Sequence, residues 1–125
     1  MVKFTIELPP VTKKNHSEIL INRKTGKRFV APSKQYRQYE KEAMWFIPRP
    51  EKPIDYPVNV KCLFYRSTRR RMDLTGAQQA VDDIMVKAGL LKDDCCDIVV
   101  GHDGSRVLYD KENPRTEVEI TKEEV

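Results

Sequence analysis

The chain has 125 residues, of which 39% are hydrophobic and 34% charged; this composition predicts one globular domain over residues 1–125 and argues against a disordered segment. Lysine and arginine number 23 against 19 aspartate and glutamate residues, a formal net charge of +4, so where the basic residues lie matters more than their excess. No apolar run approaches the roughly 18 residues of a membrane span and no signal peptide is visible, so we expect a cytoplasmic protein outside any membrane.

The three cysteines, Cys62, Cys95 and Cys96, are an odd number without CxxC spacing. This pattern argues against both a disulfide framework and a zinc site, and it favours a reducing compartment. Cys95 and Cys96 are adjacent, and neighbours on a strand face opposite ways, so we expect one of them in the core.

The first segment, residues 2–8, alternates apolar and polar side chains, which predicts a half-buried strand that ends at Pro9. A polar loop follows, with Lys13, Lys14 and Asn15 as candidate donors to phosphate. A plain polar loop has the same composition, so both interpretations stay open.

Residues 18–22 and 27–32 predict a hairpin around a basic turn in which Gly26 can take a positive φ. Ser33 is a good N-cap for a helix that ends at Pro48, since apolar residues recur three and four apart. We expect the aromatic residues of this helix to pack in the core rather than to stack on bases. They are Tyr36, Tyr39, Trp45 and Phe46.

Residues 48–57 contain four prolines and predict an extended linker. The strand-like run 58–66 comes next, and it leads into Arg69, Arg70 and Arg71, a basic loop suited to phosphate.

From Thr75 to Gly89 the pattern is helical, with apolar residues gathered on one side. Asp83 lies at the edge of that side, where a carboxylate can be partly desolvated, whereas Asp82 should face water or a partner. The apolar residues are Ala77, Ala80, Val81, Ile84, Ala88 and Leu91.

The remaining chain predicts strands at 97–101, 106–109 and 116–121, connected mainly as hairpins. The order of elements then predicts an α+β domain, with a mixed β-sheet and two main helices packed on one face.

Acidic residues concentrate beside the arginine loop. Five aspartates fall within 22 residues: Asp73, Asp82, Asp83, Asp93 and Asp94. Such acids repel a phosphate backbone unless a cation lies among them, so arginines beside carboxylates are typical of a metal-dependent phosphodiesterase. Acids at helix ends and turns are also common as caps and surface charge, which is the structural alternative.

Residues 65–100 resemble the RusA family of Holliday-junction resolvases, the structure-selective endonucleases associated with phages and prophages. The resemblance rests on a run of arginines, an Asp-Leu pair opening a helix, a Lys-Ala-Gly helix end and a late Asp-Asp pair. Here these are Arg69–Arg71, Asp73-Leu74, Lys87-Ala88-Gly89 and Asp93-Asp94, with Asp83 at the matching helix position. The loop with Asn15 and the Arg115 before the last strand look similar as well.

The resemblance implies that Asp73 and Asp94 bind Mg²⁺, with Mn²⁺ able to substitute. The chain departs from the family pattern at three positions: Thr75 stands where the family has a second catalytic Asp, Gly76 where it has Asn, and Gln79 where it has Lys. Asp83 or Asp103 would then complete the metal site, while Thr75 coordinates through its hydroxyl or a water.

Two functions follow from the resemblance. The first is a Mg²⁺-dependent endodeoxyribonuclease that resolves four-way DNA junctions by paired symmetric nicks and acts as a homodimer. The second is a weak or inactive relative that binds branched DNA within a prophage replication or recombination module. In the enzyme, Lys92 or an arginine would offset phosphate charge. His102 is either a general base or an exposed turn histidine.

Overall fold

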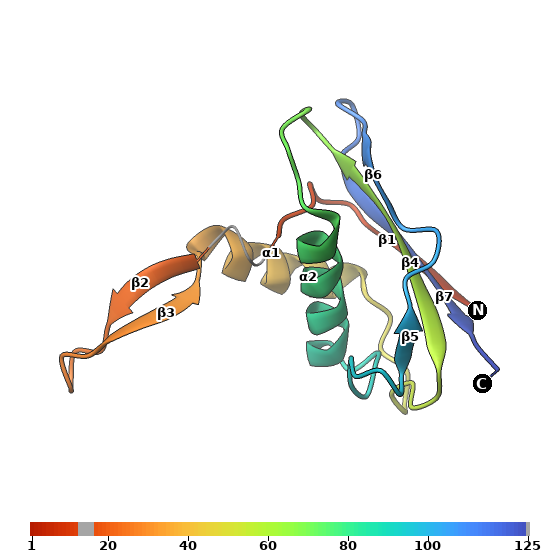
Figure 1. The fold of residues 1–125 in the computed structure, drawn as a ribbon, viewed down its shortest axis with the longest axis horizontal. Helices are drawn as coiled ribbons and strands as arrows, with labels where there is room; N and C mark the ends of the chain where they lie inside the picture. The colour runs from red at the N-terminus through yellow and green to blue at the C-terminus, as the bar shows by residue number, and fades with distance from the viewer. Residues whose placement is uncertain (13–16, 125) are drawn as a thin grey trace.

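The computed structural model describes residues 1–12 and 17–124. It has the predicted α+β architecture, a five-stranded mixed sheet with both helices on one face (Figure 1). The strands of this sheet are β1 (Val2–Ile6), β4 (Val58–Arg66), β5 (Val99–Gly101), β6 (Arg106–Tyr109) and β7 (Arg115–Lys122). The helices are α1 (Lys34–Ala43), which runs into the short 3₁₀ helix η1 (Met44–Phe46), and α2 (Leu74–Lys87).

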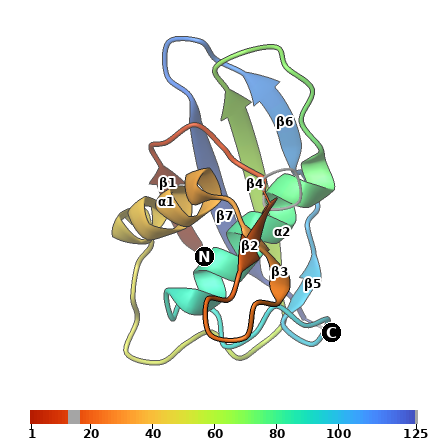
Figure 2. The same ribbon diagram turned by 90° about the vertical axis from the view of Figure 1, so that its left-hand side faces the viewer.

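Strand β4 is the centre of the sheet (Figure 2). β7 pairs with it antiparallel on one side, and β1 pairs antiparallel with β7. On its other side β5 pairs with the start of β4 and β6 with its end, both parallel to it. The predicted hairpin between 97–101 and 106–109 is therefore wrong: β4 is long enough to pair with two short strands in succession, so β5 and β6 run in the same direction.

Helix α2 covers the sheet with the apolar side that its sequence predicts. All six of the predicted residues are buried, at 0–7% exposure. The side-chain oxygen of Asp73 accepts a hydrogen bond from the Thr75 backbone N–H at 3.2 Å and caps the first turn. Gly89, with φ of 85°, follows the end of the helix in the left-handed conformation that favours glycine.

Helix α1 begins as predicted, with the Ser33 hydroxyl accepting from the Tyr36 N–H at 3.1 Å. Tyr36 and Tyr39 are in the core, but Trp45 is 87% exposed, so the core prediction for that residue is wrong. The helix ends before Trp45 and the chain tightens into η1, which turns the indole outward.

The cysteine prediction is also wrong. Cys95 and Cys96 are both exposed, because they lie in a turn that precedes β5 rather than on a strand. The buried cysteine is Cys62, where burial raises the thiol pKa to about 12.

The predicted hairpin forms a separate two-stranded sheet, β2 (Ser17–Ile21) with β3 (Arg28–Pro32). It extends away from the main sheet beyond α1 (Figure 1). The preceding Lys13, Lys14 and Asn15 lie outside the described residues.

The proline-rich segment 48–57 is irregular, as predicted, except at one point. The Ile54 N–H donates to the Leu90 carbonyl at 2.8 Å, and the Lys92 N–H donates to the Ile54 carbonyl at 2.9 Å. These two bonds fix the path of the chain after α2 and so determine where Asp93 and Asp94 lie.

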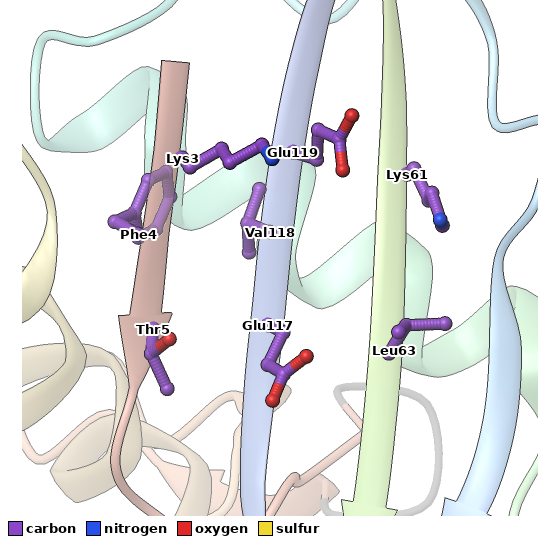
Figure 3. A pocket seen from close by; sticks show the side chains of 8 residues that line it. All are labelled: Lys3, Phe4, Thr5, Lys61, Leu63, Glu117, Val118 and Glu119. Carbon is purple, nitrogen blue, oxygen red and sulfur yellow. The ribbon is translucent and has the colours of Figure 1, made fainter.

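The face of the sheet away from the helices is open and carries charges of both signs (Figure 3). Lys3, Lys61, Glu117 and Glu119 alternate across β1, β7 and β4 around a shallow hollow. Mixed charge of this kind does not provide the basic surface that DNA binding needs. In the described part of the chain, no helix is long and apolar enough to span a membrane.

Candidate active site

A cavity of about 500 Å³ lies between α2, the segment after it and the turn 102–105. Four of its lining residues, Thr75, Gln78, Gln79 and Asp82, recur at helical spacing and form a polar stripe along α2. The other lining residues are Leu74, Asp94, His102 and Ser105. The cavity thus unites residues that are far apart in the sequence.

Asp82 is buried, with 6% exposure, although its sequence position predicts a solvent-facing side chain. One carboxylate oxygen accepts from Gln78 Nε2 at 3.3 Å, and the other lies 2.7 Å from His102 Nε2. The prediction fails because Gln78 and the turn 102–105, through His102, cover this part of α2 beside its apolar side. The polar stripe at 75, 78, 79 and 82 was visible in the sequence and is the signal that could have identified Gln78 and Asp82.

Asp94 lies at the rim of the cavity as an exposed side chain. Partial desolvation raises its pKa, and the neighbouring carboxylates Asp93 and Asp82 raise it further. The Asp93 side chain is held by its neighbour, since its carboxylate oxygen accepts a hydrogen bond from the Asp94 backbone N–H at 2.8 Å. Carboxylates that disfavour one another's charge are stabilised when a cation lies between them.

Asp73 begins the helix whose next two residues, Leu74 and Thr75, line the cavity. Its second carboxylate oxygen points towards Gly76, where an added Cβ would lie 3.7 Å away. An added Cβ at position 76 would also lie 3.4 Å from Thr12. Glycine at this position therefore lets the segment after β1 approach the start of α2.

Asp83, the predicted third ligand, is not part of this cavity. It lies on the side of α2 that faces α1, where Lys87 Nζ is 3.6 Å from Asp83 and 2.9 Å from Glu40. The hydrogen bond to Glu40 raises the Lys87 pKa, and Asp83 adds to the effect. This group of charges joins the two helices.

Asp103 and Lys92, two further predicted residues, are also absent from the cavity lining. The backbone of Asp103 exchanges hydrogen bonds with the Asn59 side chain, at 2.8 and 3.1 Å, which ties the turn to β4. Lys92 is exposed. Of the predicted site residues, the structure therefore brings Thr75 and Asp94 to the cavity, with Asp73 at the helix start beside Thr75.

The described residues contain no group of three or more histidine, cysteine or acidic side chains arranged to hold a metal ion. The donors at hand are carboxylate and hydroxyl oxygens, which Mg²⁺ and Mn²⁺ prefer. Mg²⁺ needs only one or two protein carboxylates when substrate phosphate supplies further oxygens. The donor chemistry therefore fits a Mg²⁺ ion that binds together with substrate.

The arginine loop after β4 is organised by Arg66. Its Nε donates to the Leu108 carbonyl at 3.1 Å and its Nη1 to the Arg70 carbonyl at 2.7 Å. Arg69 stacks over the Tyr109 ring with 4.2 Å to the centroid. The loop is thus attached to β6 by two arginines.

Arg70 and Arg71 line a second cavity, of about 670 Å³, whose other wall is the segment 9–12 after β1. Arg69, Arg70 and Arg71 are all exposed. Arg115 has a different role: it bonds Asp110 at 2.9 Å and Glu117 at 2.8 Å and stacks on Tyr65, which holds the loop before β7.

The family model described as Endodeoxyribonuclease RusA matches residues 7–121 of the chain. This range includes α2, the arginine loop, the late Asp-Asp pair and every residue that lines the cavity on α2. No curated protein matches the chain significantly. Since the match covers nearly the whole sequence, the chain belongs to the RusA endodeoxyribonuclease family.

Proposed function

We propose that this protein is a Mg²⁺-dependent endonuclease that resolves four-way DNA junctions by paired symmetric nicks. The observation that carries the proposal is the cavity on α2, where Asp94 and Thr75 lie beside a buried acid and a histidine. Membership of an endodeoxyribonuclease family supports the same reaction class.

Asp73 and Asp94 are the proposed metal ligands, with the Thr75 hydroxyl coordinating directly or through a water. Desolvation is the main cause of the raised pKa of Asp94, and the neighbouring acids Asp93 and Asp82 add to it; their repulsion supports this assignment because a cation would relieve it. When bound, Mg²⁺ or Mn²⁺ would polarise the scissile phosphate and lower the pKa of a coordinated water. Asp83 is left out because it lies on the other side of α2.

The exposed arginines Arg69, Arg70 and Arg71 would hold the DNA backbone and offset charge on the phosphate. Support comes from the second cavity, where Arg70 and Arg71 face the segment that leads towards Lys13 and Lys14. Lys13, Lys14, Asn15 and Lys92 are proposed as further phosphate donors. Gln79 is neutral, so it cannot supply the positive charge that the family has at this position.

Two symmetric nicks across a four-way junction require two active sites related by a two-fold axis. The described chain has one such cavity, so we propose a homodimer.

The second candidate function is binding of branched DNA without cleavage, within a prophage replication or recombination module. It is favoured by the two neutral side chains, Thr75 and Gln79, that line the cavity where the family has Asp and Lys.

Cleavage of a synthetic mobile four-way junction in Mg²⁺ or Mn²⁺ separates the two functions, using the parent protein, Asp94→Asn and Thr75→Asp. Symmetric nicks by the parent that are lost in Asp94→Asn support the nuclease. If only Thr75→Asp cuts, and the parent merely retards the junction on a gel, the protein is a junction binder.

A further inference from the structure

A chain of buried polar side chains runs along the floor of the α2 cavity. Gln78, with 4% exposure, donates from Nε2 to both Cys62 Sγ and Asp82 Oδ1, each at 3.3 Å. Its Oε1 has no hydrogen-bond partner in the described part of the chain. Asp82 continues the chain to His102, at 2.7 Å. Buried polar groups with incomplete partners are costly, so their presence on a helix packed on the sheet calls for a reason.

Holding the turn 102–105 in place is not that reason. The turn is already fixed to β4 by three hydrogen bonds that do not involve His102. Two join Asn59 to the Asp103 backbone, and the third runs from the Cys62 N–H to the Ser105 hydroxyl at 3.0 Å. The Asp82 carboxylate therefore acts on the imidazole itself.

The geometry of this pair determines which ring nitrogen can accept a proton. A carboxylate only accepts hydrogen bonds, so the neutral ring donates from Nε2 to Asp82 and carries a lone pair at Nδ1. Among the described residues, Nδ1 has no partner. The ring lines the cavity with Asp94 and Thr75, and its side chain is 41% exposed, so solvent can reach it.

We propose that His102, oriented by Asp82, is the general base that deprotonates the attacking water during phosphodiester hydrolysis. This inference rests on the proposed nuclease function. The water oxygen bonds to phosphorus, its proton passes to His102 Nδ1, and the bond from phosphorus to the leaving oxygen breaks. The leaving oxygen takes a proton from solvent, and the imidazolium later returns its own to solvent. Asp82 is a positioning residue that also stabilises the imidazolium.

Several charged groups surround His102. Asp82 faces it from α2, Asp94 lies across the cavity, and Asp103 follows it in the turn. The Lys61 stem reaches Gly104, where an added Cβ would lie 3.1 Å from Lys61 Cδ, but this lysine belongs to the open face of the sheet, away from α2. Because charged groups lie near the ring, the pH response of the parent must be compared with variants that change one group at a time.

The tautomer can be measured in the metal-free protein without any activity. The sequence has only two histidines, His16 and His102, so long-range ¹H–¹⁵N spectra give two imidazole patterns and His102→Gln assigns them. We expect a neutral Nε2–H ring in the parent. In Asp82→Asn the new amide can donate to Nε2, which would move the hydrogen to Nδ1. An Nδ1–H ring in the parent overturns the proposal.

The kinetic test uses the same junction with Mg²⁺, and pH profiles of single-turnover cleavage between about pH 5 and 8, where imidazoles titrate. His102→Gln should lose about 10²- to 10⁴-fold in rate, the usual contribution of a general base. It should also lose the rise in rate with pH, and Asp82→Asn should lose at least about 10-fold. Asp97→Asn, which removes an exposed charge before β5, is the matched control and should cleave at the parent rate.

Circular dichroism establishes that each variant is folded. If Asp82→Asn fails to fold, two other results test the role of His102. They are the cleavage rate of His102→Gln and the recovery of cleavage when imidazole is added to His102→Ala. Parent cleavage with an unchanged rate and pH profile in His102→Gln overturns only this inference. Absence of cleavage by the parent overturns the proposed function as well.

Discussion

At the scale of single residues, the resemblance in the sequence predicts a candidate site with one carboxylate and one cation fewer than the family pattern. Thr75 keeps an oxygen at the cavity wall but has no charge, whereas Gln79 keeps a polar group without the positive charge of Lys. Two acids line the cavity, Asp82 buried within it and Asp94 at its rim, and a third, Asp73, lies at the start of α2 beside Thr75. We therefore expect the affinity for metal to depend strongly on Asp94.

The raised pKa of Asp94 makes a prediction about stability. A carboxyl with a raised folded pKa stabilises the fold fully below its unfolded pKa, about 3.9, and that stability is lost as pH rises through the folded pKa. At pH 7 the metal-free protein thus carries a small penalty, which Asp94→Asn should remove. Because the side chain is exposed, the gain should be at most about 0.5 kcal/mol.

Mg²⁺ should raise the unfolding temperature of the parent at pH 7, by linkage, and the rise should be lost in Asp94→Asn. Thermal unfolding with and without Mg²⁺ measures both effects. Asp97→Asn removes a nearby exposed charge and should keep the response. An equal response in Asp94→Asn would show that the ion binds elsewhere.

Thr75→Asp should strengthen metal binding, since a further carboxylate at the cavity wall adds charge among oxygen donors. We expect about a tenfold lower Kd for Mn²⁺, roughly 1.4 kcal/mol, measured by calorimetry. Thr75→Asn provides the neutral, nearly isosteric comparison. If both variants bind Mn²⁺ like the parent, position 75 does not contact the ion.

At the scale of elements, the site depends on how three loops are attached to the rest of the fold. Arg66 ties the arginine loop to β6, Asn59 ties the turn 102–105, and Ile54 fixes the chain after α2. Each attachment joins segments that are distant in sequence. Rigid attachment matters because a catalytic group displaced by about 1 Å loses much of its effect.

This dependence on distant attachments explains what the sequence could and could not predict. Strands and helices follow from local periodicity, and the six apolar residues predicted to be buried in and after α2 are all buried. The cavity was not, because a helical pattern cannot tell that the turn 102–105 covers Asp82. Likewise, the outward position of Trp45 depends on tertiary context, and so does the parallel pairing of β5 and of β6 with β4.

The arginine loop makes its own prediction about DNA binding. Arg71→Gln removes one exposed cation from the second cavity, so the slope of log K against log salt should fall by about 0.9 for one lost phosphate contact. Arg49→Gln, an exposed arginine in the proline-rich linker, is the charge-matched control. Junction binding over a range of salt concentrations measures both slopes. Equal slopes for the two variants would show that Arg71 does not contact the DNA backbone.

At the scale of the whole molecule, the described chain presents two different faces. The helix face carries the cavity and the arginine loop, whereas the open face of the sheet carries Lys3 and Lys61 among Glu117 and Glu119 (Figure 3). On the helix face DNA would meet the exposed arginines of the arginine loop beside the acids of the cavity, whereas on the open face it would meet acids as often as lysines. Under the proposed function, one chain would offer one surface for one scissile strand.

If two chains act together, a hybrid dimer should reveal it. Parent protein mixed with a tagged Asp94→Asn variant, and purified as the hybrid, would contain one working site. On a supercoiled plasmid with a cruciform, the parent dimer should give linear product from two nicks, whereas the hybrid should stop at the nicked circle, because each site reaches only its own strand. A hybrid that linearises the plasmid at the parent rate would contradict the two-site arrangement, since one cavity would then serve both strands in turn.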